Sequence, residues 1–158
     1  PLLSTFLMYS GYRWFVPLLP EVTATDVWRR LLLGLAKVTN QLHGTRPWFI
    51  EAHQFRIDAS EGIGRPTPEG AHRDGVDLVA VFLVERHGIK GGESRVFEAH
   101  GPSGQRFTLT LPWTVVLLDD ARVIHETTPI QPLQPGEPAW RDTLVVTLRR
   151  GGFQDAGA

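Results

Sequence analysis

The segment Trp48-Phe49-Ile50-Glu51-Ala52-His53-Gln54-Phe55-Arg56-Ile57 decides the fold class, because its pattern of side chains has a period of about two. That period places alternate side chains on opposite faces and is typical of a β-strand. Glycine- and proline-rich turns separate the later segments of this kind, and no helical pattern lies between them. Such a series predicts an antiparallel sandwich or barrel, here a jelly-roll-like β core. The later segments are residues 76–85, 94–98, 106–109, 114–118, 123–125 and 142–148.

A helix is predicted on the N-terminal side of this core. Apolar residues recur at helical spacing between residues 27 and 42. Thr25 supplies N-cap chemistry before this stretch, and Gly44 is a stop signal after it. The 158 residues correspond to one domain, with helical support expected over residues 1–45 and the β core over residues 46–150.

The composition limits the kinds of site and partner. With 0 cysteines, any metal must be bound by some of the 6 histidines and 17 acidic residues. A formal net charge of -1 argues against nucleic acid as a partner. No apolar run reaches the ~18–20 residues of a transmembrane helix, and no secretory signal is visible. We therefore expect a cytoplasmic protein that acts on a small molecule and not on a membrane. The oligomeric state stays open, and so does the question of whether residues precede Pro1.

The main candidate for chemistry is the sequence His72-Arg73-Asp74. On an extended strand, residues two apart point to the same side, so His72 and Asp74 would face one common point. A later histidine, for which His125 is the candidate, would complete a facial triad of the kind found in non-haem Fe(II) oxygenases. Alone the pair is a weak signal, because a chain with 6 histidines and 17 acidic residues contains one by chance about as often as not. A surface loop is the alternative interpretation of the pair.

A later arginine strengthens the hypothesis. Arg141 opens the apolar segment 142–148, and a buried arginine is costly unless it is paired. At the mouth of a β-barrel, a guanidinium is suited to bind a carboxylate through two hydrogen bonds. Thr143 lies two residues further along and shares the same face, so its hydroxyl would donate to the same carboxylate.

The order His72-x-Asp74, His125, Arg141-x-Thr143 resembles the iron- and 2-oxoglutarate-dependent dioxygenase superfamily. More narrowly, the chain resembles the bacterial family that includes L-isoleucine 4-hydroxylase and a biofilm-associated relative. The segments that carry this likeness are residues 52–57, 68–77, 91–94, 118–120, 125–130 and 141–144.

The resemblance implies a mainly β, cupin-like double-stranded β-helix with N-terminal helices. It implies that His72, Asp74 and His125 bind Fe(II), that Arg141 binds the distal carboxylate of 2-oxoglutarate, and that O2 is the second cosubstrate. It also implies that the chain hydroxylates a small substrate such as a free amino acid. The turn at residues 86–89 departs from the asparagine-rich pattern expected there, which leaves the identity of the substrate open.

Three further residues are candidates for substrate binding. Gln54 and Arg56 share one face of the first predicted strand and would line a polar pocket, unless that face is an ordinary solvated one. Glu93 follows two glycines and would bind a substrate amine, unless it is simply a turn carboxylate.

Two other functions stay open at this point. One is a cupin-type metal enzyme that does not use 2-oxoglutarate, which would need the three metal ligands but has no use for Arg141. The other is a non-catalytic jelly roll that binds a sugar or another ligand, which would need no metal.

Overall fold

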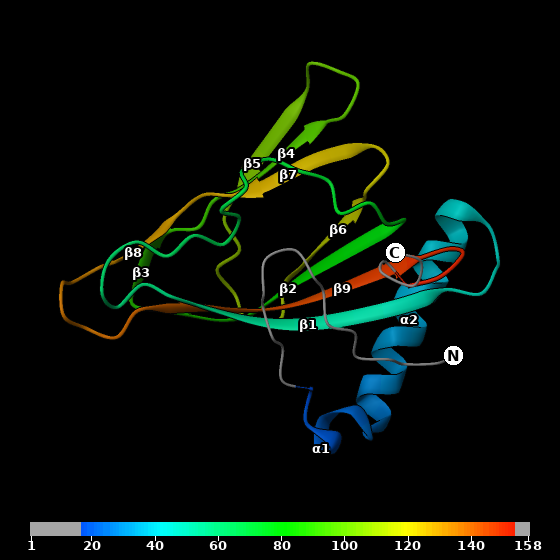
Figure 1. Ribbon diagram of the computed structural model, residues 1–158, viewed down its shortest axis with the longest axis horizontal. Helices are drawn as coiled ribbons and strands as arrows, with labels where there is room; N and C mark the ends of the chain where they lie inside the picture. The colour runs from blue at the N-terminus through cyan, green and yellow to red at the C-terminus, as the bar shows by residue number, and fades with distance from the viewer. Residues whose placement is uncertain (1–16, 154–158) are drawn as a thin grey trace.

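The computed structural model describes residues 17–153, so residues 1–16 of the expected helical support lie outside the described residues. The described part contains two helices followed by a series of strands, as Figure 1 shows. The helices are α1 (Pro20–Thr23) and α2 (Asp26–His43). The strands are β1 (Phe49–Asp58), β2 (Leu78–His87), β3 (Ile89–Gly91), β4 (Ser94–Glu98), β5 (Gly104–Phe107), β6 (Val115–Asp119), β7 (Val123–Thr127), β8 (Ile130–Pro132) and β9 (Trp140–Arg149).

The strands form the two layers of a double-stranded β-helix. The larger sheet has the order β1-β9-β2-β6, and the smaller one has the order β5-β4-β7. The short pair β3-β8 continues the second layer at the narrow end of the molecule (Figure 1). All these pairings are antiparallel, and the last strand, β9, lies between β1 and β2. The predicted mainly β fold with helices at its N-terminal side is therefore correct.

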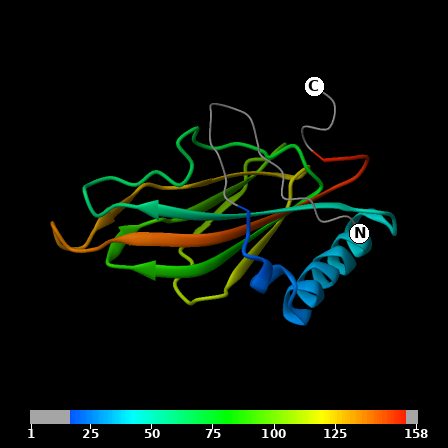
Figure 2. The same cartoon turned by 60° about the horizontal axis from the view of Figure 1, so that its bottom comes forward.

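Helix α2 covers the outer face of the larger sheet (Figure 2). It begins where the Thr25 hydroxyl accepts a hydrogen bond from the Trp28 backbone N–H at 3.1 Å, the N-cap geometry that the sequence indicates. The buried side of α2 packs on alternate residues of three strands, which leaves the other face of each strand for the interior of the β-helix. The buried cluster comprises Trp28, Leu32, Leu35, Ile50, Ala52, Leu78, Ala80, Phe82, Leu144, Val146 and Leu148.

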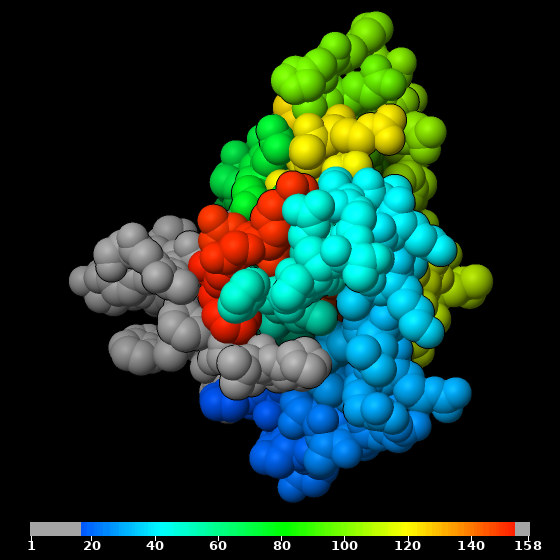
Figure 3. All heavy atoms as spheres, turned by 90° about the vertical axis from the view of Figure 1, so that its right-hand side faces the viewer, coloured from blue at the N-terminus to red at the C-terminus, as the bar shows by residue number. Residues whose placement is uncertain are grey.

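A second apolar cluster fills part of the space between the two sheets. Val79 and Leu118 of the larger sheet are buried there, and Val96 and Val123 of the smaller sheet pack against them. Phe153 meets Phe49 edge-on with 5.0 Å between ring centroids. Figure 3 shows this end of the molecule, where the last described part of the chain (red) lies beside the segment that leads from α2 into β1 (cyan). Among residues 17–153, neither helix is long and apolar enough to cross a bilayer.

The structure differs from the sequence prediction in two strands and in several strand boundaries. β3 and β8 were not expected, because each has three residues and contains glycine or proline, which obscures an alternating pattern. β9 begins at Trp140, two residues before the predicted segment. The earlier start places Arg141 within the strand, where its side chain has a defined face.

A matched pair of glycine substitutions tests the close approach of β3 and β8. Gly91 has φ 81°, and an added Cβ would lie 2.3 Å from the Pro129 carbonyl oxygen. Gly136 has a similar φ of 84°, but its added Cβ would meet nothing within 4 Å. We expect Gly91→Ala to lower the free energy of unfolding by about 3 kcal/mol and Gly136→Ala by about 1 kcal/mol, measured by urea unfolding. Equal losses would contradict a steric role for the Pro129 carbonyl.

Candidate metal centre and its cavity

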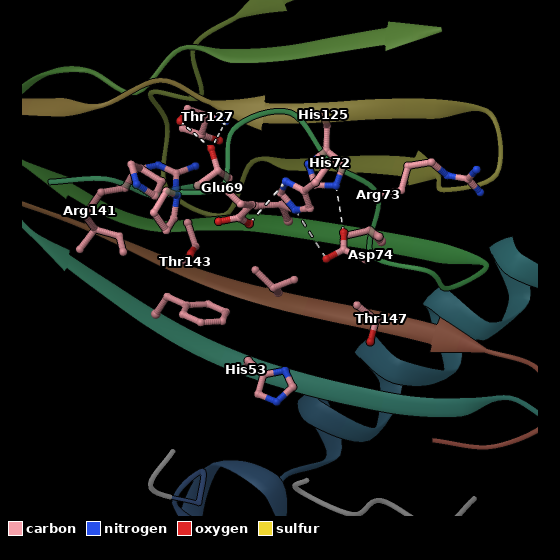
Figure 4. A pocket seen from close by; sticks show the side chains of 18 of the residues that line it. His53, Glu69, His72, Arg73, Asp74, His125, Thr127, Arg141, Thr143 and Thr147 are labelled. Carbon is pink, nitrogen blue, oxygen red and sulfur yellow. Dashed lines mark hydrogen bonds and ion pairs between the residues drawn. The ribbon is translucent and has the colours of Figure 1, made fainter. Parts of the chain in front are cut away.

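His72, Asp74 and His125 meet in the interior of the β-helix (Figure 4). One ligand atom from each lies within 4.8 Å of the others, and no metal ion is part of the structure. His125 Nε2 is 2.9 Å from Asp74 Oδ2, and His72 Nε2 is 3.8 Å from Asp74 Oδ1. The structure thus brings together the three residues that the sequence singled out as metal ligands.

The backbone brings these residues together in a different way from the one expected. Residues 70–75 form a loop and not an extended strand. The loop contacts β7 through an isolated bridge, in which the His72 N–H donates to the His125 carbonyl and the His125 N–H donates to the His72 carbonyl, each at 3.0 Å. This double hydrogen bond fixes the two imidazoles beside each other, with 4.6 Å between ring centroids.

The surroundings of His72 leave one ring nitrogen for a metal. Nδ1 lies 2.9 Å from the Gly70 carbonyl oxygen, which can only accept, so Nδ1 carries the proton. The other ring nitrogen, Nε2, faces Asp74 and is the one available to a metal. Such an outer hydrogen bond sets the tautomer and orientation of a metal-binding imidazole.

The charge of Asp74 also suits a metal. Burial raises the pKa of this carboxyl, but the hydrogen bond from His125 and the charges of His125 and His72 outweigh burial, so the pKa lies below its usual value. The carboxylate is therefore ionised at neutral pH. Two imidazole nitrogens and one carboxylate oxygen on one side of an open space are the donor set of non-haem Fe(II) sites, so these residues fit such a metal.

The metal centre opens on a cavity of about 580 Å³ between the sheets. The loop at residues 66–69, residues 72–74 and the strand β7 line one side, and the inner faces of β1, β2 and β9 line the other. Figure 4 shows Arg141 and Thr143 on β9, facing the same space as the three candidate ligands. Arg141 and Thr143 share a face because they are two residues apart on one strand.

Arg141 is a buried cation in this cavity. Only 4% of its surface is exposed, and among residues 17–153 no hydrogen bond or ion pair holds its guanidinium. Burial and the nearby charge of Arg86, its cross-strand partner on β2, lower the pKa of Arg141 to about 10. The guanidinium is still charged at neutral pH, so the site is suited to an anionic ligand supplied from outside.

The expected substrate residues Gln54 and Arg56 do not line the cavity. Both are exposed on the outer face of β1, where Arg56 donates two hydrogen bonds to Asp142, at 2.8 and 2.5 Å. The alternation of faces was predicted correctly, but the side assigned to the pocket was wrong. The inward positions are Glu51, His53, Phe55 and Ile57.

Glu93 does not line the cavity either. Its carboxylate pairs with Arg95, two residues further along on β4, with 2.9 Å between Oε1 and Nε. The interpretation as a turn carboxylate describes it better than a contact with substrate.

Two groups of residues at the site were missed by sequence reasoning. Glu69 and Arg73 line the cavity beside the metal centre, and only their closeness to His72 in the chain could have suggested this. Asp120 is fully buried behind the loop at residues 70–75, although the sequence pattern indicates no more than a turn.

The fold is a double-stranded β-helix, and its cavity combines two histidines and one carboxylate with a buried arginine. This combination is typical of β-helix proteins that bind a metal and an anion together. Comparison with known proteins identifies the family within this class. A family model described as 2OG-Fe dioxygenase matches residues 9–147. The chain belongs to the 2OG-Fe dioxygenase family. Fe(II), 2-oxoglutarate and O2 are the cofactor and cosubstrates that this family implies, and the donor set found here fits them.

Solved structures show the same relationship. A bsmA homologue from Methylobium petroleophilum PM1 is 57% identical, with a TM-score of 0.86 over 92% of this chain. IDO from Bacillus thuringiensis is 22% identical with a TM-score of 0.76 over 92% of this chain. The Fe(II)/α-ketoglutarate-dependent dioxygenase TqaL is 18% identical with a TM-score of 0.72 over 94% of this chain, and like IDO it supports the fold alone.

The chain spans only part of these proteins, namely 59% of the bsmA homologue, 65% of IDO and 62% of TqaL. None of the curated proteins matches the sequence.

Proposed function

We propose that this chain, residues 1–158, is the catalytic domain of a cytoplasmic Fe(II)/2-oxoglutarate-dependent dioxygenase that hydroxylates a small free amino acid. The observation that carries the proposal is the pairing of two features in one cavity. The three candidate metal ligands lie within 4.8 Å of one another, and a buried arginine without a partner among residues 17–153 faces the same space.

Each side chain has a defined task in this proposal. His72, Asp74 and His125 hold Fe(II) from one side and leave its remaining positions open to the cavity. The Arg141 guanidinium binds the distal carboxylate of 2-oxoglutarate, and the Thr143 hydroxyl, which is buried beside it, donates to the same group. Iron with 2-oxoglutarate and O2 supplies the oxidising power for hydroxylation, while the protein binds, orients and excludes water.

The apolar wall of the cavity supports this division of tasks. Val79 and Val81 of β2, Val145 of β9 and Phe55 of β1 line the cavity together with the charged groups. These side chains limit the water that reaches the reacting groups, which strengthens every charge interaction in the cavity.

The charged groups on the cavity wall support a small zwitterion as substrate. Glu51 is 3% exposed, and Glu69 and Arg73 are exposed side chains on the loop beside the metal centre. Carboxylates of this kind bind an ammonium group, and a guanidinium binds a carboxylate. A cavity of about 580 Å³ accommodates 2-oxoglutarate together with a molecule of amino-acid size.

Arg141 separates this proposal from the two alternatives. A cupin-type enzyme that does not use 2-oxoglutarate, or a ligand-binding jelly roll without a metal, does not explain a buried cation opposite an intact donor set. Because the cation is costly to bury, its place in the cavity favours an anionic cosubstrate.

The proposal is tested in two stages with the purified protein. Anaerobic addition of Fe(II) and then 2-oxoglutarate is expected to produce the visible metal-to-ligand charge-transfer absorption of the chelate. Succinate release in air, screened over free amino acids, is then expected to rise for one substrate well above the uncoupled rate. Iron binding without the absorption band would contradict the use of 2-oxoglutarate. The band without stimulation by any amino acid would contradict the substrate class alone.

A further inference from the structure

Asp120 lies behind the candidate metal centre, where backbone N–H groups surround its carboxylate. Its side chain is 0% exposed, and its two oxygens accept three backbone hydrogen bonds from consecutive residues. Oδ1 accepts from the Asp74 N–H at 3.0 Å, and Oδ2 accepts from the Gly75 N–H at 2.9 Å and from the Val76 N–H at 3.1 Å. Three backbone donors thus tie this buried side chain to the loop that carries Asp74.

The backbone of Asp120 also binds the residues on either side of this segment, Arg73 and Asp77. Its carbonyl accepts from Arg73 Nε at 2.7 Å, and its N–H donates to the Asp77 carbonyl at 3.3 Å. Every residue from 73 to 77 therefore contacts Asp120 through at least one hydrogen bond.

The hydrogen bonds of Asp120 hold residues 73–77, which belong to no helix or strand. Asp74 belongs to neither a helix nor a strand, and the bridge to β7 pairs His72 but not Asp74. Loop backbone without ladder hydrogen bonds opens more readily than a sheet. There the Asp74 N–H donates a hydrogen bond to Asp120 Oδ1.

We propose that Asp120 is a positioning residue of the metal centre, which holds the backbone of Asp74 so that its carboxylate stays beside His72 and His125. The inference rests on the proposed role of Asp74 as a metal ligand. Asp120 touches neither the ligand atoms nor the cavity, and it acts through the loop. Metal affinity depends on such preorganisation, and loss of outer-shell support costs about 10–100-fold in affinity in known metal sites.

The test compares Asp120→Asn with a matched control, Asp77→Asn. Asparagine keeps the shape of Asp120 but replaces one acceptor oxygen by an NH2 group, which faces backbone N–H donors and repels them. Asp77 is also buried, at 8% exposed, but its carboxylate binds Arg150, through the backbone N–H at 2.8 Å and the guanidinium at 2.8 and 2.5 Å. Both variants lose hydrogen bonds to a buried carboxylate. Only the Asp120 carboxylate binds the backbone of residues 74–76, next to the candidate metal ligands.

The readout is the dissociation constant of Co(II), titrated into metal-free protein at a temperature where circular dichroism shows both variants folded. We expect Asp120→Asn to weaken Co(II) binding about tenfold or more, and Asp77→Asn to change it less than about threefold even though it lowers Tm.

Three results would overturn the inference or what it rests on. Wild-type affinity in folded Asp120→Asn would contradict positioning by Asp120 while leaving the proposed function intact. Equal weakening in both variants would show that Asp120 acts only through general stability. No binding of Co(II) or Fe(II) by the wild-type protein would remove the metal site itself.

Discussion

Replacement of Arg141 by methionine is expected to stabilise the metal-free protein and to abolish 2-oxoglutarate-dependent turnover. Both effects are expected because Arg141 is a buried cation whose proposed partner is the carboxylate of 2-oxoglutarate. Burial and the charge of Arg86 lower the pKa of Arg141 to about 10 in the folded state, well below its usual value. The charged form is thus disfavoured by folding, and a shift of this size corresponds to about 3 kcal/mol.

The size of this penalty depends on pH in a defined way. Because the folded-state pKa is below the unfolded-state value, charged Arg141 lowers the free energy of unfolding at every pH below about 10. The penalty shrinks as the pH rises above about 10 towards the ordinary pKa of arginine. Methionine removes the penalty at neutral pH, so urea unfolding of metal-free Arg141→Met at pH 7.5 is expected to require more denaturant than the wild type.

Arg56→Met is the matched control for Arg141→Met. Arg56 is an exposed arginine on the outer face, paired with the buried Asp142. Its removal leaves that carboxylate without a guanidinium partner, so we expect lower stability and an unchanged KM for 2-oxoglutarate. Iron-dependent turnover that survives in Arg141→Met without a requirement for 2-oxoglutarate would favour the cupin-type alternative. A loss of stability in Arg141→Met would contradict the buried, unpaired state of this cation.

Replacement of His125 by alanine is expected to reduce kcat/KM by roughly three orders of magnitude or more, because one of three metal ligands is lost. His125 is also the residue whose Nε2 contacts Asp74 at 2.9 Å, so its removal disturbs two ligands together. The measurement that does not depend on turnover is thermal unfolding with and without Co(II). The wild type should gain Tm on adding the metal, and His125→Ala should gain none.

His100→Ala is the control for histidine removal, because His100 is exposed in the turn between β4 and β5. It is expected to keep both turnover and the metal-dependent gain in Tm. Retention of that gain in His125→Ala would show that the metal binds elsewhere, and the assignment of His125 would then be wrong.

Local patterns in the sequence were sufficient for the fold class and for much of the element order. The change of period after Pro47 and the N-cap at Thr25 correspond to β1 and α2 in the structure. These features are local, because the spacing of apolar side chains along the chain indicates a strand or a helix. The weakest elements, β3 and β8, escaped detection because three residues do not make a pattern.

The same patterns could not predict which face of a strand points inward. Alternation in β1 separates Glu51 and His53 from Gln54 and Arg56, but both sets are polar, so hydrophobicity cannot decide between them. The decision comes from α2, which covers the face that carries Ile50 and Ala52, and so turns Glu51 and His53 towards the cavity.

The sequence by itself determined that this chain is a cysteine-free, mainly β protein whose candidate metal ligands are histidine and aspartate. Its motif order also indicated the 2OG-Fe dioxygenase family, which the family model supports. The tertiary structure alone decided that His72 meets His125 through a loop, that Asp120 holds the backbone of Asp74, and that Arg141 is buried facing the cavity. These contacts join residues far apart in the chain. Their existence depends on the register and packing of whole sheets, which no local spacing of residues encodes.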